Sequence, residues 1–205
     1  TTTTVQIDTD HPVQACMASQ YAGWQLATDD YFGMGSGPMR AAAGKEALFD
    51  EIGFTEKAKQ IVGVVESGST PTASVCQLIA DTCGVKPQDL TLVYAPTASL
   101  AGTVQVVARS LETALHKLHE LGFDLSRVQS GSGTAPLPPV AGEDLAGIGR
   151  TNDAILYGGE ATLWVTGDDQ SIEQLGAQTP SSSSEDYGRP FIEIFRQYDN
   201  DFYKI

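Results

Sequence analysis

The stretch IVGVVESGSTPTASVCQLIADTCGVKPQDLTLVYA (residues 61–95) decides the fold class, because it contains a strand, a helix and a second strand in order. Its opening IVGVVE is an apolar run of the length of a buried strand. Thr70 and Pro71 then indicate a helix start, and Gly84 indicates the end of that helix. The closing LTLVYA (residues 90–95) predicts the second strand. A strand–helix–strand order is typical of an α/β protein.

The residues before this stretch continue the alternation of strands and helices. Residues 5–9 alternate weakly between polar and apolar side chains, as a short strand does. Pro12 then precedes apolar residues at helical spacing, so the sequence predicts a helix through residues 13–24. The stretch YFGMGSGPMRAAA (residues 31–43) predicts a strand, a tight loop at its glycine cluster and a helix that begins at Pro38.

The residues after it follow the same alternation. The longest expected helix covers residues 98–121, with leucines and valines on one face and Gly122 at its end. Residues 143–157 predict another helix and residues 161–166 predict a strand. The serines at 181–184 predict a polar linker. The whole pattern therefore favours α/β architecture with alternating strands and helices.

Charge and composition exclude several classes of function. The 205 residues include 26 acidic and 12 basic side chains, and the net charge of −14 argues against a nucleic-acid partner. No apolar run reaches the roughly 20 residues that a membrane-spanning helix needs. Three scattered cysteines predict thiols in a reducing cytoplasm rather than a disulfide framework. The chain opens without an initiator methionine or a secretory signal, so we expect it to be part of a longer chain.

Polar residues line one stripe of the long predicted helix. Gln105, Arg109, Glu112, His116 and His119 recur at spacings of four, three, four and three, beside the apolar face. An arginine three residues from a glutamate keeps the carboxylate ionised and oriented, and partial burial lets that carboxylate take a proton from water. The pair is therefore a candidate water-activating base. The alternative interpretation is a solvated surface ion pair.

Two other patterns suggest binding chemistry. Glu112, His116 and His119 form an ExxxHxxH set that could hold a metal ion, and the alternative is a pair of surface histidines. The glycine runs GMGSG (residues 33–37) and SGSG (residues 130–133) either form turns or let the backbone approach a flat ligand. Neither run fits a Walker loop or a dinucleotide-binding fingerprint.

Several longer strings, taken together, closely resemble the methenyltetrahydromethanopterin cyclohydrolase family. They appear in the order that this family shows and cover nearly the whole chain. The strings are SQYAGW (residues 19–24), YFGMGSGPMRA (31–41), VVES (64–67), YAPTASLAGTVQVVARSLETALHKLHELGFD (94–124), GTAPLPPV (133–140), GRTNDAILYGG (149–159) and DYGRPFIEIF with YDNDFYKI (186–205).

The resemblance implies a cytoplasmic hydrolase of one-carbon metabolism, as in methanogenesis, methylotrophy and formaldehyde oxidation. Such an enzyme interconverts 5,10-methenyltetrahydromethanopterin and 5-formyltetrahydromethanopterin without a metal or prosthetic group. The resemblance also implies two α/β lobes with the pterin in a cleft between them, here residues 1–94 and 95–205, and a homo-oligomer, often a homotrimer. The family's chains are longer, so segments at both ends are expected to be missing.

The resemblance assigns site residues as well. The family's catalytic Arg–Glu pair corresponds to Arg109 and Glu112 in ARSLET, with Glu112 as the water-activating base and Arg109 as the group that orients it. Tyr21 stands where archaeal members have a water-binding lysine. The other expected water or substrate contacts are Gln105, Gly35, Ser36, Arg40, Thr97, Ser99 and Asn152.

Two alternatives from other classes accompany this reading. A non-catalytic pterin-binding or assembly subunit would shift the spectrum of the methenyl group without consuming it. A metallohydrolase that uses Glu112, His116 and His119 would require bound zinc.

Overall fold

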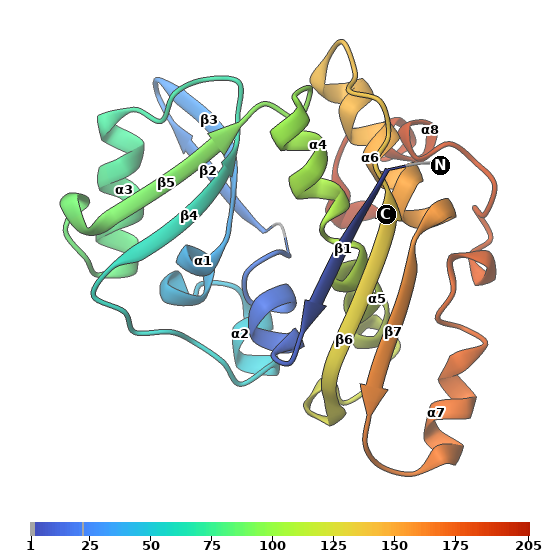
Figure 1. Ribbon diagram of the computed structural model, residues 1–205. Coiled ribbons are helices and arrows are strands. Elements are labelled where there is room, and N and C mark those ends of the chain that lie inside the picture. Colours follow the sequence, from blue (N-terminus) through green and yellow to red (C-terminus); the bar gives the residue numbers. More distant parts are fainter. Residues whose placement is uncertain (1–2, 22) are drawn as a thin grey trace. The chain divides into compact units, whose positions relative to one another are not determined.

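A computed structural model describes residues 3–21 and 23–205, and it confirms a mixed α/β protein with two sheets and interleaved helices (Figure 1). The chain forms two compact units. One consists of Thr1–Asp10 together with Thr97–Ile205, and the other consists of His11–Pro96. The lobes expected at 1–94 and 95–205 stay a prediction. The main difference is that the two units group Thr1–Asp10 with Thr97–Ile205. No helix in the described residues is long and apolar enough to cross a membrane.

The unit His11–Pro96 contains a four-stranded sheet in the order β2-β3-β4-β5. β2 (Trp24–Thr28), β3 (Tyr31–Ser36) and β4 (Ile61–Glu66) pair antiparallel, whereas β4 and β5 (Leu90–Ala95) pair in parallel. Parallel strands need a crossover connection, and α3 (Ala73–Cys83) supplies it. The strand–helix–strand prediction for this stretch is therefore confirmed.

The start of α3 differs from the prediction by two residues. Thr72, not Thr70, is the N-cap, and its hydroxyl accepts a hydrogen bond from the Val75 amide at 3.5 Å. The Thr70 hydroxyl lies 2.8 Å from the Tyr94 hydroxyl on β5 and is hydrogen-bonded there. The Thr70 hydroxyl is therefore engaged with β5, and Thr72 caps the helix instead. Gly84 ends the helix as predicted, in the left-handed conformation with φ +70°.

The predicted helix through residues 13–24 is much shorter in the structure. A π-helix η1 covers only Val13–Met17, and Trp24 instead begins β2, where it pairs with Gly35 of β3. Ala22 lies outside the described residues. Apolar spacing alone did not distinguish a helical turn followed by a strand from a continuous helix, since both place Met17 and Trp24 in partly or fully buried positions.

The glycine cluster of this unit lies in a strand rather than in a turn. Gly33 and Gly35 are part of β3, so the turn interpretation of both is wrong, while Gly37 with φ +87° does form the N-cap of α1 (Pro38–Ala43). A Cβ atom on Gly35 would lie 2.7 Å from Cε of Met39. Gly35 therefore lets α1 pack closely against the sheet. The buried core around this contact is Leu26, Tyr31, Met39, Ile61, Val65, Val75 and Ile79.

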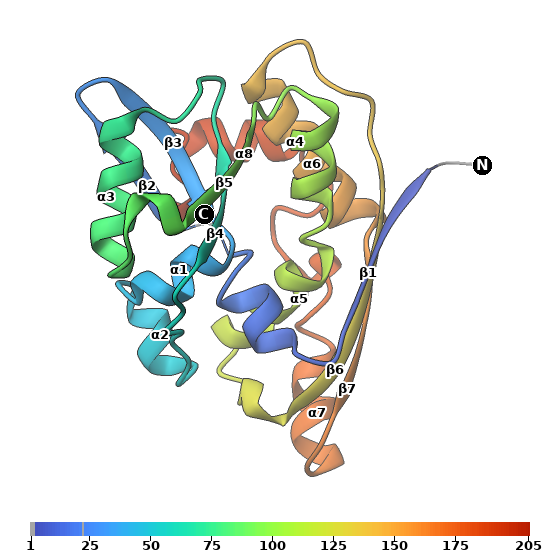
Figure 2. The ribbon, with the colours of Figure 1, turned by 60° about the vertical axis from the view of Figure 1, so that its left-hand side comes forward.

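The other unit contains a three-stranded antiparallel sheet in the order β1-β6-β7. Its strands are β1 (Thr4–Thr9), β6 (Val128–Pro136) and β7 (Glu160–Val165). Figure 2 shows this sheet nearly edge-on, with α4 (Leu100–Val107) and α5 (Ser110–Glu120) on one side of it. The run SGSG lies within β6, so its turn interpretation is also wrong.

The helices after β6 agree with the predictions in part. The predicted helix and strand are confirmed as α6 (Asp144–Gly158) and β7. The serines expected to form a linker instead contain the short 3₁₀ helix η4 (Ser181–Ser183). The remaining elements are α2 (Ala47–Glu51), α7 (Asp169–Gly176), α8 (Phe191–Gln197), η2 (Pro87–Asp89), η3 (Leu125–Arg127) and η5 (Phe202–Lys204).

The long predicted helix over residues 98–121 is divided into α4 and α5. Between them, Arg109 adopts φ −89° and ψ 9°, and its amide donates to the Val106 carbonyl, three residues back, at 2.9 Å. Both the amide and the hydroxyl of Thr113 donate to the Arg109 carbonyl. The single-helix prediction is therefore wrong at residues 108–109, although the helical spacing on each side is confirmed.

Candidate active site

The predicted catalytic residues lie where α4 gives way to α5. Arg109 is the N-cap residue of α5, and Glu112 is in the first turn of that helix. Only 7% of Glu112 is exposed. The N-terminus of a helix carries a partial positive charge, which favours a carboxylate at this position over a neutral side chain. The break between the helices thus sets a buried acid and an arginine on consecutive turns.

Gln105 belongs to the same group of side chains. Nη2 of Arg109 donates a hydrogen bond to Oε1 of Gln105 at 2.9 Å, across the break between the two helices. This bond holds one end of the guanidinium and so limits its rotamers. The structure therefore brings Gln105 and Arg109 together, as the stripe predicted, and keeps Glu112 one turn further along.

The histidines of the stripe do not extend this group into a metal site. Nε2 of His116 lies 3.4 Å from Oε1 of Glu120. Burial lowers the pKa of His116, and this effect outweighs the attraction of Glu120, which raises that pKa. In residues 3–21 and 23–205, no three histidine, cysteine or acidic side chains are placed to hold a metal ion together. The ExxxHxxH alternative thus has no geometric support.

Thr97 and Ser99 contribute to the start of α4. The Ser99 hydroxyl accepts from the Gly102 amide at 3.0 Å and so caps the helix. The Ala98 amide donates to Oδ1 of Asp144 at 2.7 Å. A Cβ atom on Gly147 would lie 3.1 Å from Cγ2 of Thr97, so Thr97 packs closely against α6. These contacts fix the loop that leads into α4.

Asn152 lies on α6 in the same unit. Its Nδ2 atom donates to the Ile148 carbonyl, one turn earlier, at 2.9 Å. This bond orients the side-chain amide along the helix.

The remaining candidate residues lie in the other compact unit. Arg40 on α1 is fully buried, and its Nε donates to Oε1 of Glu46 at 3.0 Å. Its Nη1 donates to the Met17 carbonyl at 3.3 Å. The guanidinium also lies over the rings of Tyr21, at 5.2 Å, and Phe49, at 5.5 Å. The structure therefore brings Arg40 and Tyr21 together.

Gly35 and Ser36 are consecutive residues of β3 in that unit. Gly35 pairs with Val65, and Ser36 pairs with Val64, on the neighbouring strand β4. Gly35 leaves room for Met39, and only 5% of Ser36 is exposed. Gly35 thus contributes to the packing of α1 against the sheet.

Sequence reasoning missed the partners that fix the candidate side chains. Glu46 holds Arg40, Asp144 holds the loop before α4, and Gly133 lies against the first turn of α5. Glu46 lies six residues after Arg40, a spacing that no helical or strand pattern singles out. Only the folded chain places these residues beside the ones that they position.

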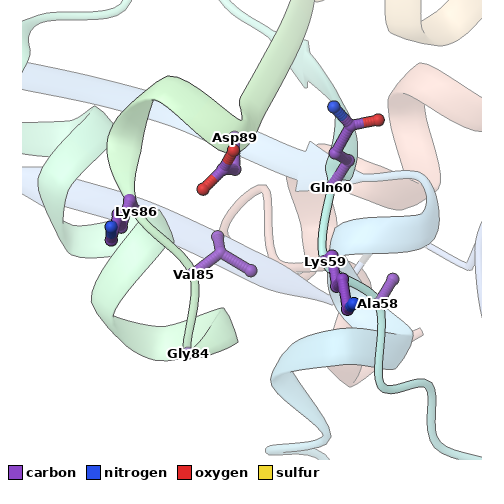
Figure 3. A pocket seen from close by; sticks show the side chains of 7 residues that line it. All are labelled: Ala58, Lys59, Gln60, Gly84, Val85, Lys86 and Asp89. Carbon is purple, nitrogen blue, oxygen red and sulfur yellow. The ribbon is translucent and has the colours of Figure 1, made fainter.

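A surface cavity of about 960 Å³ lies elsewhere in the unit His11–Pro96 (Figure 3). The residues that line it are Ala58, Lys59, Gln60, Gly84, Val85, Lys86 and Asp89. None of the candidate residues lines this cavity. It is formed where the end of α3 and η2 meet the segment before β4.

Comparison with known proteins identifies close relatives. The family described as "Cyclohydrolase (MCH)" matches residues 1–205. A methenyltetrahydromethanopterin cyclohydrolase of Rhodopirellula baltica is 52% identical over 206 residues, which cover 98% of this chain and 62% of that protein. The proteins of the same name from Methylobacillus flagellatus and Methanococcoides burtonii are 50% and 46% identical, over 98% of this chain and 62% and 63% of their own lengths. The chain thus spans somewhat less than two thirds of these relatives.

Proposed function

This chain belongs to the methenyltetrahydromethanopterin cyclohydrolase (MCH) family, and from that premise we propose that the protein hydrolyses 5,10-methenyltetrahydromethanopterin to 5-formyltetrahydromethanopterin. The observation that carries this proposal is the match of residues 1–205 to the family, with relatives about half identical to the chain. The buried Glu112 beside Arg109 at the start of α5 supplies the chemistry.

The reaction needs a placed water rather than a strong electrophilic catalyst. The methenyl carbon lies between two nitrogens that share a positive charge, so it is already electrophilic. The water oxygen bonds to this carbon, and the carboxylate of Glu112 accepts a proton from the water. The hydroxyl group on the carbon then loses its proton as the C=O bond forms, the bond from the carbon to N10 breaks, and N10 takes up a proton. The formyl group stays on N5, and one of the two water protons is released overall. Positioning of the water accounts for much of the rate.

Arg109 orients the carboxylate and stabilises the oxygen that becomes the formyl group. Its hydrogen bond to Gln105 supports this role, because a guanidinium held at one end presents its other donors in a fixed direction. The charge at N5 and N10 spreads over the amidine, and the partial negative charge develops on the attacking oxygen. A fixed cation beside that oxygen lowers the barrier.

The other candidate residues have supporting roles in the proposal. Tyr21 is a proposed water or substrate contact, and the guanidinium of the fully buried Arg40 lies over its ring. In the proposal, the pterin or its side chain contacts the segments that contain Gly35, Ser36, Thr97, Ser99 and Asn152. The protein would act in the cytoplasm as a homo-oligomer, such as a homotrimer, with a small-molecule pterin as its partner.

The substitution Glu112→Gln tests this function, because it keeps the size of the side chain but removes the proton acceptor. We expect kcat to fall on the order of a hundredfold, with KM changed by less than about twofold. The readout is the loss of the methenyl absorbance with time. Glu120→Gln on the same helix is the matched control, because the Glu120 side chain is 66% exposed, and it should keep normal turnover.

Near-normal turnover of Glu112→Gln would contradict the assignment of the base. A parent protein that shifts the absorption spectrum of the methenyl compound without consuming it would contradict the enzymatic function as a whole, and it would favour a pterin-binding subunit.

A further inference from the structure

The face of β6 that points toward α4 and α5 carries small residues. Gly131, Gly133 and Ala135 alternate with residues of the opposite face, and all three are buried. Ala135 packs with Val106 and Val107 of α4. Gly131 and Gly133 lie under the first turn of α5. The strand therefore supports the two helices on either side of the break that holds Arg109.

Gly133 is in contact with the backbone of α5. A Cβ atom at this position would lie 2.8 Å from the Leu111 amide nitrogen, 2.8 Å from Oγ of Ser110 and 2.9 Å from Cβ of Leu111. These distances are shorter than van der Waals contact, and a backbone atom inside a helix cannot turn away as a side chain can. A side chain at 133 would therefore displace the first turn of α5, which contains Glu112 and follows Arg109.

Gly131 offers a close comparison on the same strand and the same face. A Cβ atom there would lie 2.8 Å and 3.0 Å from Cδ1 and Cδ2 of Leu111, and 3.1 Å from Cδ2 of Leu163. All three atoms are ends of flexible side chains, which can change rotamer. Neither Gly131 nor Gly133 has a positive φ, so an alanine is compatible with the backbone at both positions. The two glycines differ in the atoms that an added methyl group would contact, which include helix backbone at Gly133 and are only side-chain ends at Gly131.

We propose that Gly133 is a positioning residue for the catalytic pair, because its missing side chain lets β6 set the place of the first turn of α5. This inference rests on the proposed function. Arg109 and Glu112 flank Ser110 and Leu111, the two residues that the Gly133 Cα faces. A shift of Leu111 N away from β6 moves both catalytic side chains relative to the water. Misplacement by a fraction of an ångström is enough to reduce the rate.

The test compares Gly133→Ala with Gly131→Ala in the purified protein. We expect Gly133→Ala to lower kcat about tenfold with KM within about twofold, while Gly131→Ala keeps kcat within about twofold. Thermal unfolding of both variants is measured in parallel. Equal kcat values for the two variants, whether both normal or both reduced, would overturn the proposal.

A second pair of variants changes the same contact from the α5 side, at Ser110. This pair tests the proposal if Gly133→Ala does not fold. Ser110→Thr adds a methyl group to a residue that is only 5% exposed, and we expect a similar loss of kcat. Ser110→Ala removes a buried hydroxyl that makes no hydrogen bond within the described residues, so its kcat should stay within about twofold of the parent. Normal kcat in a folded Ser110→Thr protein would overturn the proposal.

A double variant separates positioning from a general loss of structure. If Gly133 acts through the catalytic pair, then Gly133→Ala should lower kcat by less than about twofold in the Arg109→Leu/Glu112→Gln background. A full tenfold effect in that background would show that Gly133 acts elsewhere. The single variant Glu112→Gln tests the proposed function by itself, so the two ideas can fail separately.

Discussion

The substitution Arg40→Met removes a buried guanidinium while keeping much of the volume of the side chain. The Arg40 side chain is fully buried and bonds Glu46, whose side chain is 25% exposed. Breaking a buried ion pair typically costs about 3–5 kcal/mol, because the remaining charge stays away from water. Water can reach part of Glu46, so we expect the lower end of that range, about 3 kcal/mol. The lost bond to the Met17 carbonyl acts in the same direction.

This loss corresponds to a large change in thermal stability. For a chain of this size, 1 kcal/mol shifts the unfolding temperature by about 2–4 °C, so Arg40→Met should lower it by about 6–12 °C. The assay is thermal unfolding followed by circular dichroism. The control is Lys204→Met, whose ion pair with Asp199 at 3.4 Å is exposed on both sides and should contribute less than about 1 kcal/mol.

The double variant Arg40→Met/Glu46→Leu tests the cause of the loss. Because it removes both charges, it should be less destabilised than the sum of the two single variants. A shift below about 2 °C for Arg40→Met, combined with a loss of substrate affinity, would refute the structural role and would favour direct contact between Arg40 and the pterin.

Three further predictions concern the α4–α5 region. Arg109→Leu should lower kcat at least about tenfold, and normal kcat in stopped-flow assays would contradict its role. Burial lowers the pKa of His116, so the unfolded chain takes up a proton near pH 6.5 that the folded chain does not, and stability falls as pH drops. The urea midpoint of His116→Gln should therefore fall less than that of the parent between pH 7 and 5.5, and equal losses would argue against it. Dialysis against a chelator should leave turnover unchanged, and loss that zinc restores would favour the ExxxHxxH site.

The strands could be predicted from the sequence because their signal is local. IVGVVE and LTLVYA are apolar runs of strand length, and both are strands in the structure. The break between α4 and α5 could not be predicted in this way. No proline or glycine marks residues 108–109, and the first turn of α5 lies against Gly133 of β6, which is more than twenty residues away in sequence. Local propensity does not include that contact.

In the candidate site, too, some features follow from local sequence and others depend on distant contacts. The spacing of Arg109 and Glu112 predicted their neighbourhood, since three residues make nearly one helical turn. Family resemblance, rather than spacing, favoured a catalytic role for this pair over a surface ion pair. The burial of Arg40 and its bond to Glu46 depend on how α1 packs, and neither follows from a pattern in the residues around them.

The unit that contains β1 is made of two separate stretches of the chain, Thr1–Asp10 and Thr97–Ile205, and this affects the order in which the chain folds. β1 pairs with β6 from Thr9–Gly131 to Thr4–Pro136, so the two strands are separated by more than a hundred residues. During synthesis, β1 cannot pair with its partner until β6 has left the ribosome. The intervening His11–Pro96 carries its own sheet and core, so its folding before β1 and β6 pair would shorten the loop that remains to be closed. Slow refolding from denaturant should therefore be governed by the docking of Thr4–Thr9 onto β6.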